Sequence, residues 1–266
     1  MLQFSAVSKR YASGLLAIDG IELSVARGEF VGIVGESGCG KSTLLRIASG
    51  LEGLTGGGVL LNGKGITAPH PEIGMVFQEP RLMPWLTIRE NVAFGIRALP
   101  ASERQSRVDR ALERVGLTSF AAAWPRELSG GMAQRASLAR ALVEQPSVLL
   151  LDEPFSALDA LTRADLQDHL ADLWSEDRPT VVLVTHDIEE ALFLSDRVLV
   201  MRGRPGQIRA EVRCDLPRPR DRAGATFQAL KRQILAELQH SVGSRSTVGA
   251  TATPAGIIPF ATARAG

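Results

Sequence analysis

Three short apolar runs recur along the chain, and each ends in a polar or glycine-rich turn. They cover residues 29–35 (EFVGIVG), 147–153 (SVLLLDE) and 180–186 (TVVLVTH). Continuous apolar runs of this length are typical of parallel strands that are buried on both faces of a sheet. The pattern therefore predicts an α/β core built on a parallel sheet.

The pattern changes between residues 78 and 145, where strand-like runs are replaced by helical periodicity. In the segment RVDRALERVGL, one helical face carries Val108, Ala111, Leu112 and Val115. We therefore expect a helical subdomain, at about residues 79–145, inserted into a single domain that spans residues 1–240. Residues 241–266 are small, polar and aperiodic, and we predict that they form a disordered tail.

Composition narrows the function classes. The 266 residues are 45% hydrophobic and 22% charged, as expected for a folded chain with ample core, and the net charge of +1 provides no basic field for nucleic acid. Cys39 and Cys214 form no metal-binding or disulfide pattern, which fits a reducing cytosol. No apolar run approaches the roughly 20 residues that span a bilayer, and the N-terminus lacks a signal core. Any role at a membrane is therefore expected to depend on a partner.

The sequence GESGCGKST lies between a predicted buried strand and a predicted helix. Its glycines allow backbone N–H groups to surround a phosphate chain, while the Lys41 ammonium reaches the β- and γ-phosphates and the Ser42 hydroxyl binds Mg²⁺. Cys39 is expected to be a passive small residue rather than a catalytic thiol, because no His is adjacent. The predicted nucleotide contacts of this loop are Gly35, Glu36, Ser37, Gly38, Cys39, Gly40, Lys41, Ser42 and Thr43.

Two acids, Asp152 and Glu153, end the predicted strand at residues 147–153. An acid at the carboxyl end of a strand beside a phosphate loop can hold Mg²⁺, and its neighbour can polarise an attacking water. We assign Asp152 to the metal and Glu153 to the water; the alternative is a pair of solvated loop acids.

A third motif, LSGGM, places Ser129, Gly130 and Gly131 at the start of a long segment rich in Ala, Leu and Arg. A Ser followed by glycines at the start of a helix leaves backbone N–H groups open to an anion. The simpler interpretation is an N-cap and a flexible turn.

Together these motifs resemble the ATP-binding cassette (ABC) ATPase family over roughly residues 2–220. The sequences that carry the resemblance, in the family's order, are GESGCGKST, VFQEP, LSGGM, VLLLDEP, SALD and VTHD. It implies an α/β P-loop NTPase fold with a mainly parallel sheet, an N-terminal antiparallel β part and an inserted helical subdomain. It also implies a homodimer in which Ser129 and the amides of Gly130 and Gly131 contact the γ-phosphate of the ATP held by the other chain.

The resemblance assigns further roles one residue at a time. Tyr11 matches the aromatic residue that stacks on adenine, and Gln78 matches the residue that links Mg²⁺ and the attacking water to the helical subdomain. His186 matches the switch that contacts the γ-phosphate, and Asp159 matches a loop that crosses the dimer interface. Without the resemblance, Tyr11 would be interpreted as a surface residue, His186 as a structural one and Asp159 as an N-cap. The implied catalytic set is Glu153, His186, Gln78 and Lys41, and the implied metal set is Ser42, Gln78 and Asp152.

The signature departs from the common family pattern at Met132, where Gln is usual. Met has nearly the same length but no amide, and we expect ATP-driven closure to survive because the other phosphate donors remain. Met132, with the segments FQEPRLMPWLTIRENV, DRVLVMRGRPGQI and DLPRPRDR, resembles the importer branch for nitrate, aliphatic sulfonates and taurine. We interpret DLPRPRDR as a solvated connector rather than a lipid or nucleic-acid contact.

The resemblance thus implies an ATP-hydrolysing subunit of an ABC importer at the cytoplasmic face of the bacterial inner membrane. Its implied partners are transmembrane permease subunits and, indirectly, an extracytoplasmic solute-binding protein. Residues 79–85 (EPRLMPW) would hold a short cytoplasmic permease helix, unless Leu82 and Trp85 pack in the core. The alternatives are a soluble ABC-type ATPase without a transmembrane partner and a metabolite kinase, which would have no use for LSGG.

Overall fold

The computed structural model describes residues 1–239, so the predicted tail at residues 241–266 lies outside the described residues. Two sheets form the framework, with strand orders β10-β9-β3-β8-β7-β6 and β2-β1-β4-β5. The strands are β1 (Leu2–Arg10), β2 (Leu16–Val25), β3 (Phe30–Gly35), β4 (Gly56–Leu61), β5 (Lys64–Gly65), β6 (Ile73–Val76), β7 (Val148–Asp152), β8 (Thr180–Thr185), β9 (Arg197–Arg202) and β10 (Gln207–Arg213).

Seven α-helices within the described range complete the fold, with three short 3₁₀ turns between β6 and β7. No helix in residues 1–239 is long and apolar enough to cross a membrane. The helices are α1 (Lys41–Ala48), α2 (Ile88–Val92), α3 (Ala101–Arg114), α4 (Gly130–Leu142), α5 (Ala160–Asp177), α6 (Ile188–Leu194) and α7 (Ala225–Gln239).

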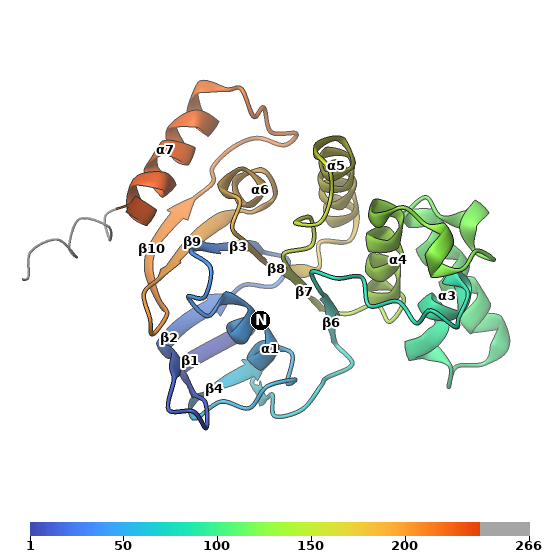
Figure 1. Cartoon of the computed structure of the whole chain (residues 1–266), viewed down its shortest axis with the longest axis horizontal. Helices are drawn as coiled ribbons and strands as arrows, with labels where there is room; N and C mark the ends of the chain where they lie inside the picture. Colours follow the sequence, from blue (N-terminus) through green and yellow to red (C-terminus); the bar gives the residue numbers. More distant parts are fainter. Residues whose placement is uncertain (240–266) are drawn as a thin grey trace, which may run out of the picture.

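The six-stranded sheet is parallel except for β10, and its central strands β3, β8 and β7 are buried at every position. Along β3, Phe30 and Val34 belong to one hydrophobic cluster, whereas Val31 and Ile33 belong to the other. Successive side chains point to opposite faces of a strand, so a strand covered on both sides must be apolar throughout. Helix α1 and the antiparallel sheet cover one face, and α5, α6 and α7 cover the other (Figure 1). The predicted fold class is confirmed.

Between β6 and β7 the chain contains helices α2, α3 and α4 and no strand. Three of the apolar positions predicted to share a face, Val108, Ala111 and Leu112, are buried on α3. Helix α4 also holds the segment that leaves β6. The Gln134 side chain donates to the Phe77 carbonyl at 3.0 Å, and Arg140 donates to the carbonyls of Pro80 and Arg81, each at 2.8 Å.

The segment DLPRPRDR corrects the prediction of a solvated connector, because Arg220 is only 7% exposed. Its guanidinium donates to the carbonyls of Leu192, Phe193 and Ser195, at the C-terminal end of α6, and to that of Cys214. The unpaired carbonyls at the end of a helix attract a cation, and this attraction offsets the desolvation of the arginine. Burial lowers the pKa of Arg220 to about 10, so the side chain stays charged at neutral pH.

Arg220→Leu is expected to lower the free energy of unfolding by about 3 kcal/mol, because it leaves several buried carbonyls without a donor. For a chain of this size, that loss corresponds to a fall in melting temperature of roughly 10 °C. The matched control is Arg213→Leu, which removes an exposed arginine from β10. Thermal unfolding of both variants checks the prediction, and equal melting temperatures would contradict it.

Candidate functional site

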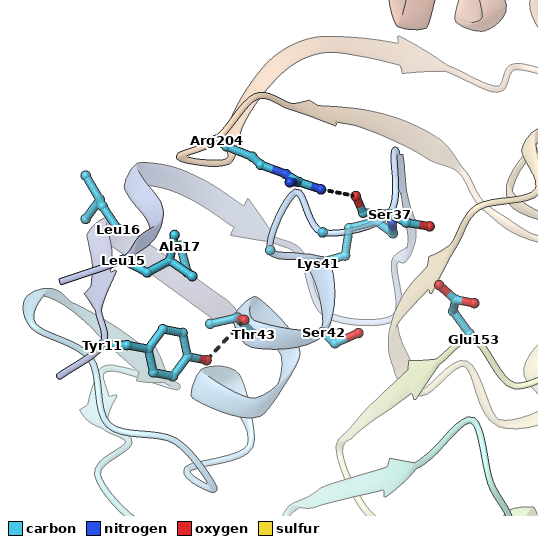
Figure 2. A pocket seen from close by; sticks show the side chains of 12 residues that line it. Tyr11, Leu15, Leu16, Ala17, Ser37, Lys41, Ser42, Thr43, Glu153 and Arg204 are labelled. Carbon is cyan, nitrogen blue, oxygen red and sulfur yellow. Dashed lines mark hydrogen bonds between the residues drawn. The ribbon is translucent and has the colours of Figure 1, made fainter. Parts of the chain in front are cut away.

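A cavity of about 470 Å³ opens at the carboxyl edge of the six-stranded sheet, a size typical of small-molecule sites. Figure 2 shows Tyr11 at one end of it and Glu153 at the other, with the loop that follows β3 between them. The residues that line the cavity are Tyr11, Leu15, Leu16, Ala17, Ser37, Gly38, Gly40, Lys41, Ser42, Thr43, Glu153 and Arg204.

The glycine-rich loop connects the end of β3 to the start of α1. Gly40 has a left-handed φ of 96°, and a Cβ at this position would lie 2.5 Å from Cγ2 of Ile18, so the loop requires glycine here. Lys41 is buried, and its Nζ donates to the carbonyls of Gly35, at 2.7 Å, and Glu36, at 3.1 Å. The loop thus presents backbone amides and one buried ammonium, which is a suitable site for a phosphate chain.

Three loop residues predicted to contact nucleotide, Gly35, Glu36 and Cys39, do not line the cavity. The Cys39 side chain is buried, and this burial raises the pKa of its thiol. A thiol with a raised pKa is a poor nucleophile, which agrees with the expectation of a passive residue.

The Ser42 hydroxyl donates to Oδ1 of Asp152 at 2.7 Å, which brings together two of the three predicted metal ligands. Burial raises the pKa of Asp152, although the hydrogen bond from Ser42 opposes this shift. A hydroxyl and a carboxylate are hard oxygen donors of the type that Mg²⁺ prefers, so this pair fits the ion. Gln78, the third residue, is exposed two residues beyond the end of β6, and its side chain forms no hydrogen bond within residues 1–239.

Glu153 and His186 follow the neighbouring strands β7 and β8. Nδ1 of His186 lies 3.0 Å from Oε2 of Glu153, so the two side chains predicted to act on the γ-phosphate and water are already in contact. Glu153 has a φ of 47°, a strained conformation that is held by a hydrogen bond from its amide to the Val184 carbonyl at 2.8 Å. This backbone conformation aims the carboxylate into the cavity (Figure 2).

Tyr11 supplies an aromatic wall at the opposite end of the cavity. The ring is half-buried, and its hydroxyl lies 3.4 Å from Oγ1 of Thr43 at the start of α1. The sequence analysis did not identify Leu15, Leu16 or Ala17, which extend this apolar wall. The sequence marks them only by their position a few residues after Tyr11, where the structure starts β2.

The LSGGM motif does not join this cavity. Ser129 caps α4, and its hydroxyl accepts a hydrogen bond from the Met132 amide at 3.3 Å. A Cβ at Gly131 would lie 2.1 Å from Cγ2 of Thr162, so any side chain at this contact between α4 and α5 would have to displace Thr162. The Met132 side chain packs against the hydrophobic core. Ser129, Gly130 and Gly131 do not line the cavity that contains the phosphate loop, and in Figure 1 helix α4 lies on the other side of β6 from α1.

The SALD segment, residues 156–159, lies between the LSGGM and VTHD motifs in the sequence. Asp159 is exposed and caps α5, where it accepts a hydrogen bond from the Thr162 amide at 3.1 Å. Arg163, one turn further on, donates to the Leu158 carbonyl at 2.9 Å, and it lies 3.9 Å from carboxylate oxygens of Asp187 and Glu190, beside His186. The structure therefore connects the Asp159 loop to the strand end that carries His186.

Comparisons with known proteins agree with this geometry. A family model described as "ABC transporter" matches residues 18–156. An aliphatic sulfonates import ATP-binding protein of Xanthomonas axonopodis pv. citri is 51% identical over 246 residues, covering 91% of this chain and 97% of the relative. A Brucella abortus relative named only as an ATP-binding protein is 47% identical over 244 residues, which cover 90% of this chain and 94% of the relative. The dimeric structure of the ATP-binding cassette MJ0796 bound to ADP and Pi is 35% identical, with a TM-score of 0.71, and covers 80% of this chain and 99% of that one.

Proposed function

Because this chain belongs to the ABC transporter family and is an ATP-binding ATPase, we propose that it powers the import of a small anion. The solute class proposed is an aliphatic sulfonate, taurine or nitrate. The support is the Xanthomonas relative, whose name specifies sulfonate import, together with the segments around Met132, Trp85 and Pro205 that resemble this branch.

In the proposed reaction, the triphosphate lies along the glycine-rich loop, with Lys41 against the β- and γ-phosphates and the adenine against Tyr11. Ser42 and Asp152, with Gln78, would hold Mg²⁺, which would neutralise phosphate charge when bound. Glu153 polarises the attacking water, and His186 donates to the γ-phosphate. The contact between Glu153 and His186 supports this division, because both groups meet where the γ-phosphate would end.

The observation that carries the proposal is that the helix start at Ser129 does not line the cavity that contains the phosphate loop. The cavity has a phosphate loop and a carboxylate, whereas the helix start at Ser129, Gly130 and Gly131 lies elsewhere, with Ser129 and Gly130 exposed. We propose that two copies pair head to tail, so that this helix start covers the ATP of the partner. A helix N-terminus with exposed amides is suited to an anion that arrives across an interface.

The proposed contact with the permease is the segment at residues 79–85. Leu82 packs against the core, as the core-packing alternative has it. Trp85 is 70% exposed, which leaves it free to contact a permease helix, as the docking alternative has it. The buried Asn91 fixes this segment, because its side chain accepts from the Met83 amide at 2.7 Å and donates to the carbonyls of Met83, Leu86 and Thr87. An exposed indole on a backbone segment held in this way is a suitable anchor for a short helix of a membrane partner. This contact would hold the chain at the cytoplasmic face of the inner membrane, below a permease fed by a solute-binding protein.

Growth of the host tests the solute class. A strain without this chain is expected not to grow on an alkanesulfonate as the sole sulfur source, but to grow normally on sulfate. The wild-type chain should restore growth, and the Glu153→Gln chain should not. Normal growth of the deletion strain on alkanesulfonates, on taurine and on nitrate as the sole nitrogen source would contradict the proposal.

A further inference from the structure

The turn between β9 and β10 places an arginine at the nucleotide cavity. β9 runs parallel to β3, and the pairing of Met201 with Gly35 puts the end of β9 beside the start of the glycine-rich loop. The next residues, Gly203, Arg204 and Pro205, turn the chain into β10. Arg204 thus reaches the cavity from an element that comes about 160 residues after the loop in sequence.

The backbone of this turn is held firmly against the site. The Gly206 amide donates to the Ala17 carbonyl at 2.9 Å, and the Asp19 amide donates to the Gly206 carbonyl at 3.1 Å. A Cβ at Gly206 would lie 1.8 Å from the Cys39 carbonyl oxygen, so the turn packs directly on the loop backbone. The turn that carries Arg204 is therefore anchored to β2 and to the backbone of the loop.

The guanidinium lies over the tip of the loop. Nη2 of Arg204 donates to the Ser37 carbonyl at 3.1 Å, as Figure 2 shows, and a Cβ at Gly38 would lie 2.6 Å from the same nitrogen. Arg204 is exposed, and it forms no salt bridge with any residue in the range 1–239. A planar group with five N–H donors has more hydrogen-bonding capacity than one carbonyl uses.

The charges around the cavity suggest what the remaining donors bind. Its ionisable lining consists of Lys41 and Arg204, which are cationic, and the acid Glu153, besides the Tyr11 phenol. The Lys41 ammonium supplies one positive charge, whereas a triphosphate carries several negative charges. The Glu153 carboxylate adds a further negative charge, so Lys41 alone does not balance the charge of a bound triphosphate. We propose that Arg204 is a second phosphate-binding cation of this site and contacts the outer phosphates, β and γ, of the nucleotide. This inference rests on the proposed nucleotide site.

The test measures how the affinity loss depends on phosphate number. Arg204→Gln is expected to weaken ATP binding about tenfold, ADP binding less, and AMP binding by less than about twofold, since charge-assisted hydrogen bonds to phosphate are lost. Competition against a fluorescent ATP analogue gives the three dissociation constants. Arg209→Gln is the matched control, because Arg209 is exposed on β10 of the same hairpin and does not line the cavity.

Three outcomes would overturn the inference. Equal affinities for Arg204→Gln and Arg209→Gln would remove Arg204 from the site. An equal loss for ATP, ADP and AMP would place the arginine on the shared α-phosphate, ribose or base rather than on the outer phosphates. The same equal loss together with a fall in the melting temperature of the nucleotide-free protein would give it only the role of holding Ser37. Failure of the wild-type protein to bind ATP would instead contradict the proposed function.

Discussion

Glu153→Gln is expected to retain ATP binding while lowering the hydrolysis rate by roughly 10²–10⁴-fold, the contribution typical of a positioned base. Gln has the shape of Glu and can keep a hydrogen bond to His186, so the cavity should remain intact. It has no negative charge with which to polarise water. Steady-state phosphate release measures the loss, and Glu113→Gln, an exposed position on α3, is the matched control.

The same variant tests whether two chains share each ATP. If hydrolysis is blocked, ATP should accumulate between two chains, and the protein should become a dimer with ATP but not with ADP. Adding Ser129→Arg should return it to a monomer, because it places a bulky side chain at an exposed position that does not line the cavity of its own chain but would lie in the proposed interface. Light scattering after size-exclusion chromatography measures both states. A Glu153→Gln protein that binds ATP but stays monomeric at high concentration would contradict the shared site.

The second large effect is expected at the loop lysine. Lys41→Met should weaken ATP binding roughly a hundredfold or more, because it removes the one buried cation of the cavity and retains only the apolar stem. The ammonium also binds the carbonyls of Gly35 and Glu36, so the melting temperature of the nucleotide-free protein must be measured in parallel. Lys64→Met, at an exposed position on β5, is the matched control. Unchanged affinity in Lys41→Met would exclude Lys41 from the site.

The sheet was predictable from sequence because its physical requirement is local. A strand covered on both faces has to be apolar at every position, and the runs that include Phe30, Val148 and Val181 satisfy this requirement without knowledge of their neighbours. The closeness of Ser42 and Asp152, which are predicted as metal ligands, follows likewise from two motifs, since the carboxyl ends of parallel strands meet at one edge.

Other features depend on partners that are distant in sequence. The prolines and charges of DLPRPRDR predict a solvated segment. Nothing near Arg220 in sequence indicates that its guanidinium donates to the last carbonyls of α6. Arg204 was overlooked for the same reason, since its place at the cavity depends on the pairing of β9 with β3 and of Gly206 with β2. At Ser129 the structure bears out the N-cap, while the contact with a partner's ATP stays a prediction.

The hydrogen bonds that α4 makes to the exit of β6 have a mechanical consequence. Gln134 binds the carbonyl of Phe77, and Arg140 binds the carbonyls of Pro80 and Arg81. The backbone on both sides of Gln78 is therefore hydrogen-bonded to α4. A connection of this kind couples the segment to the helix as one rigid body, unlike a flexible hinge. If the helical subdomain rotates, Gln78 therefore moves with α4. Its distance from Ser42 and Asp152 then changes in step with the rotation of the subdomain.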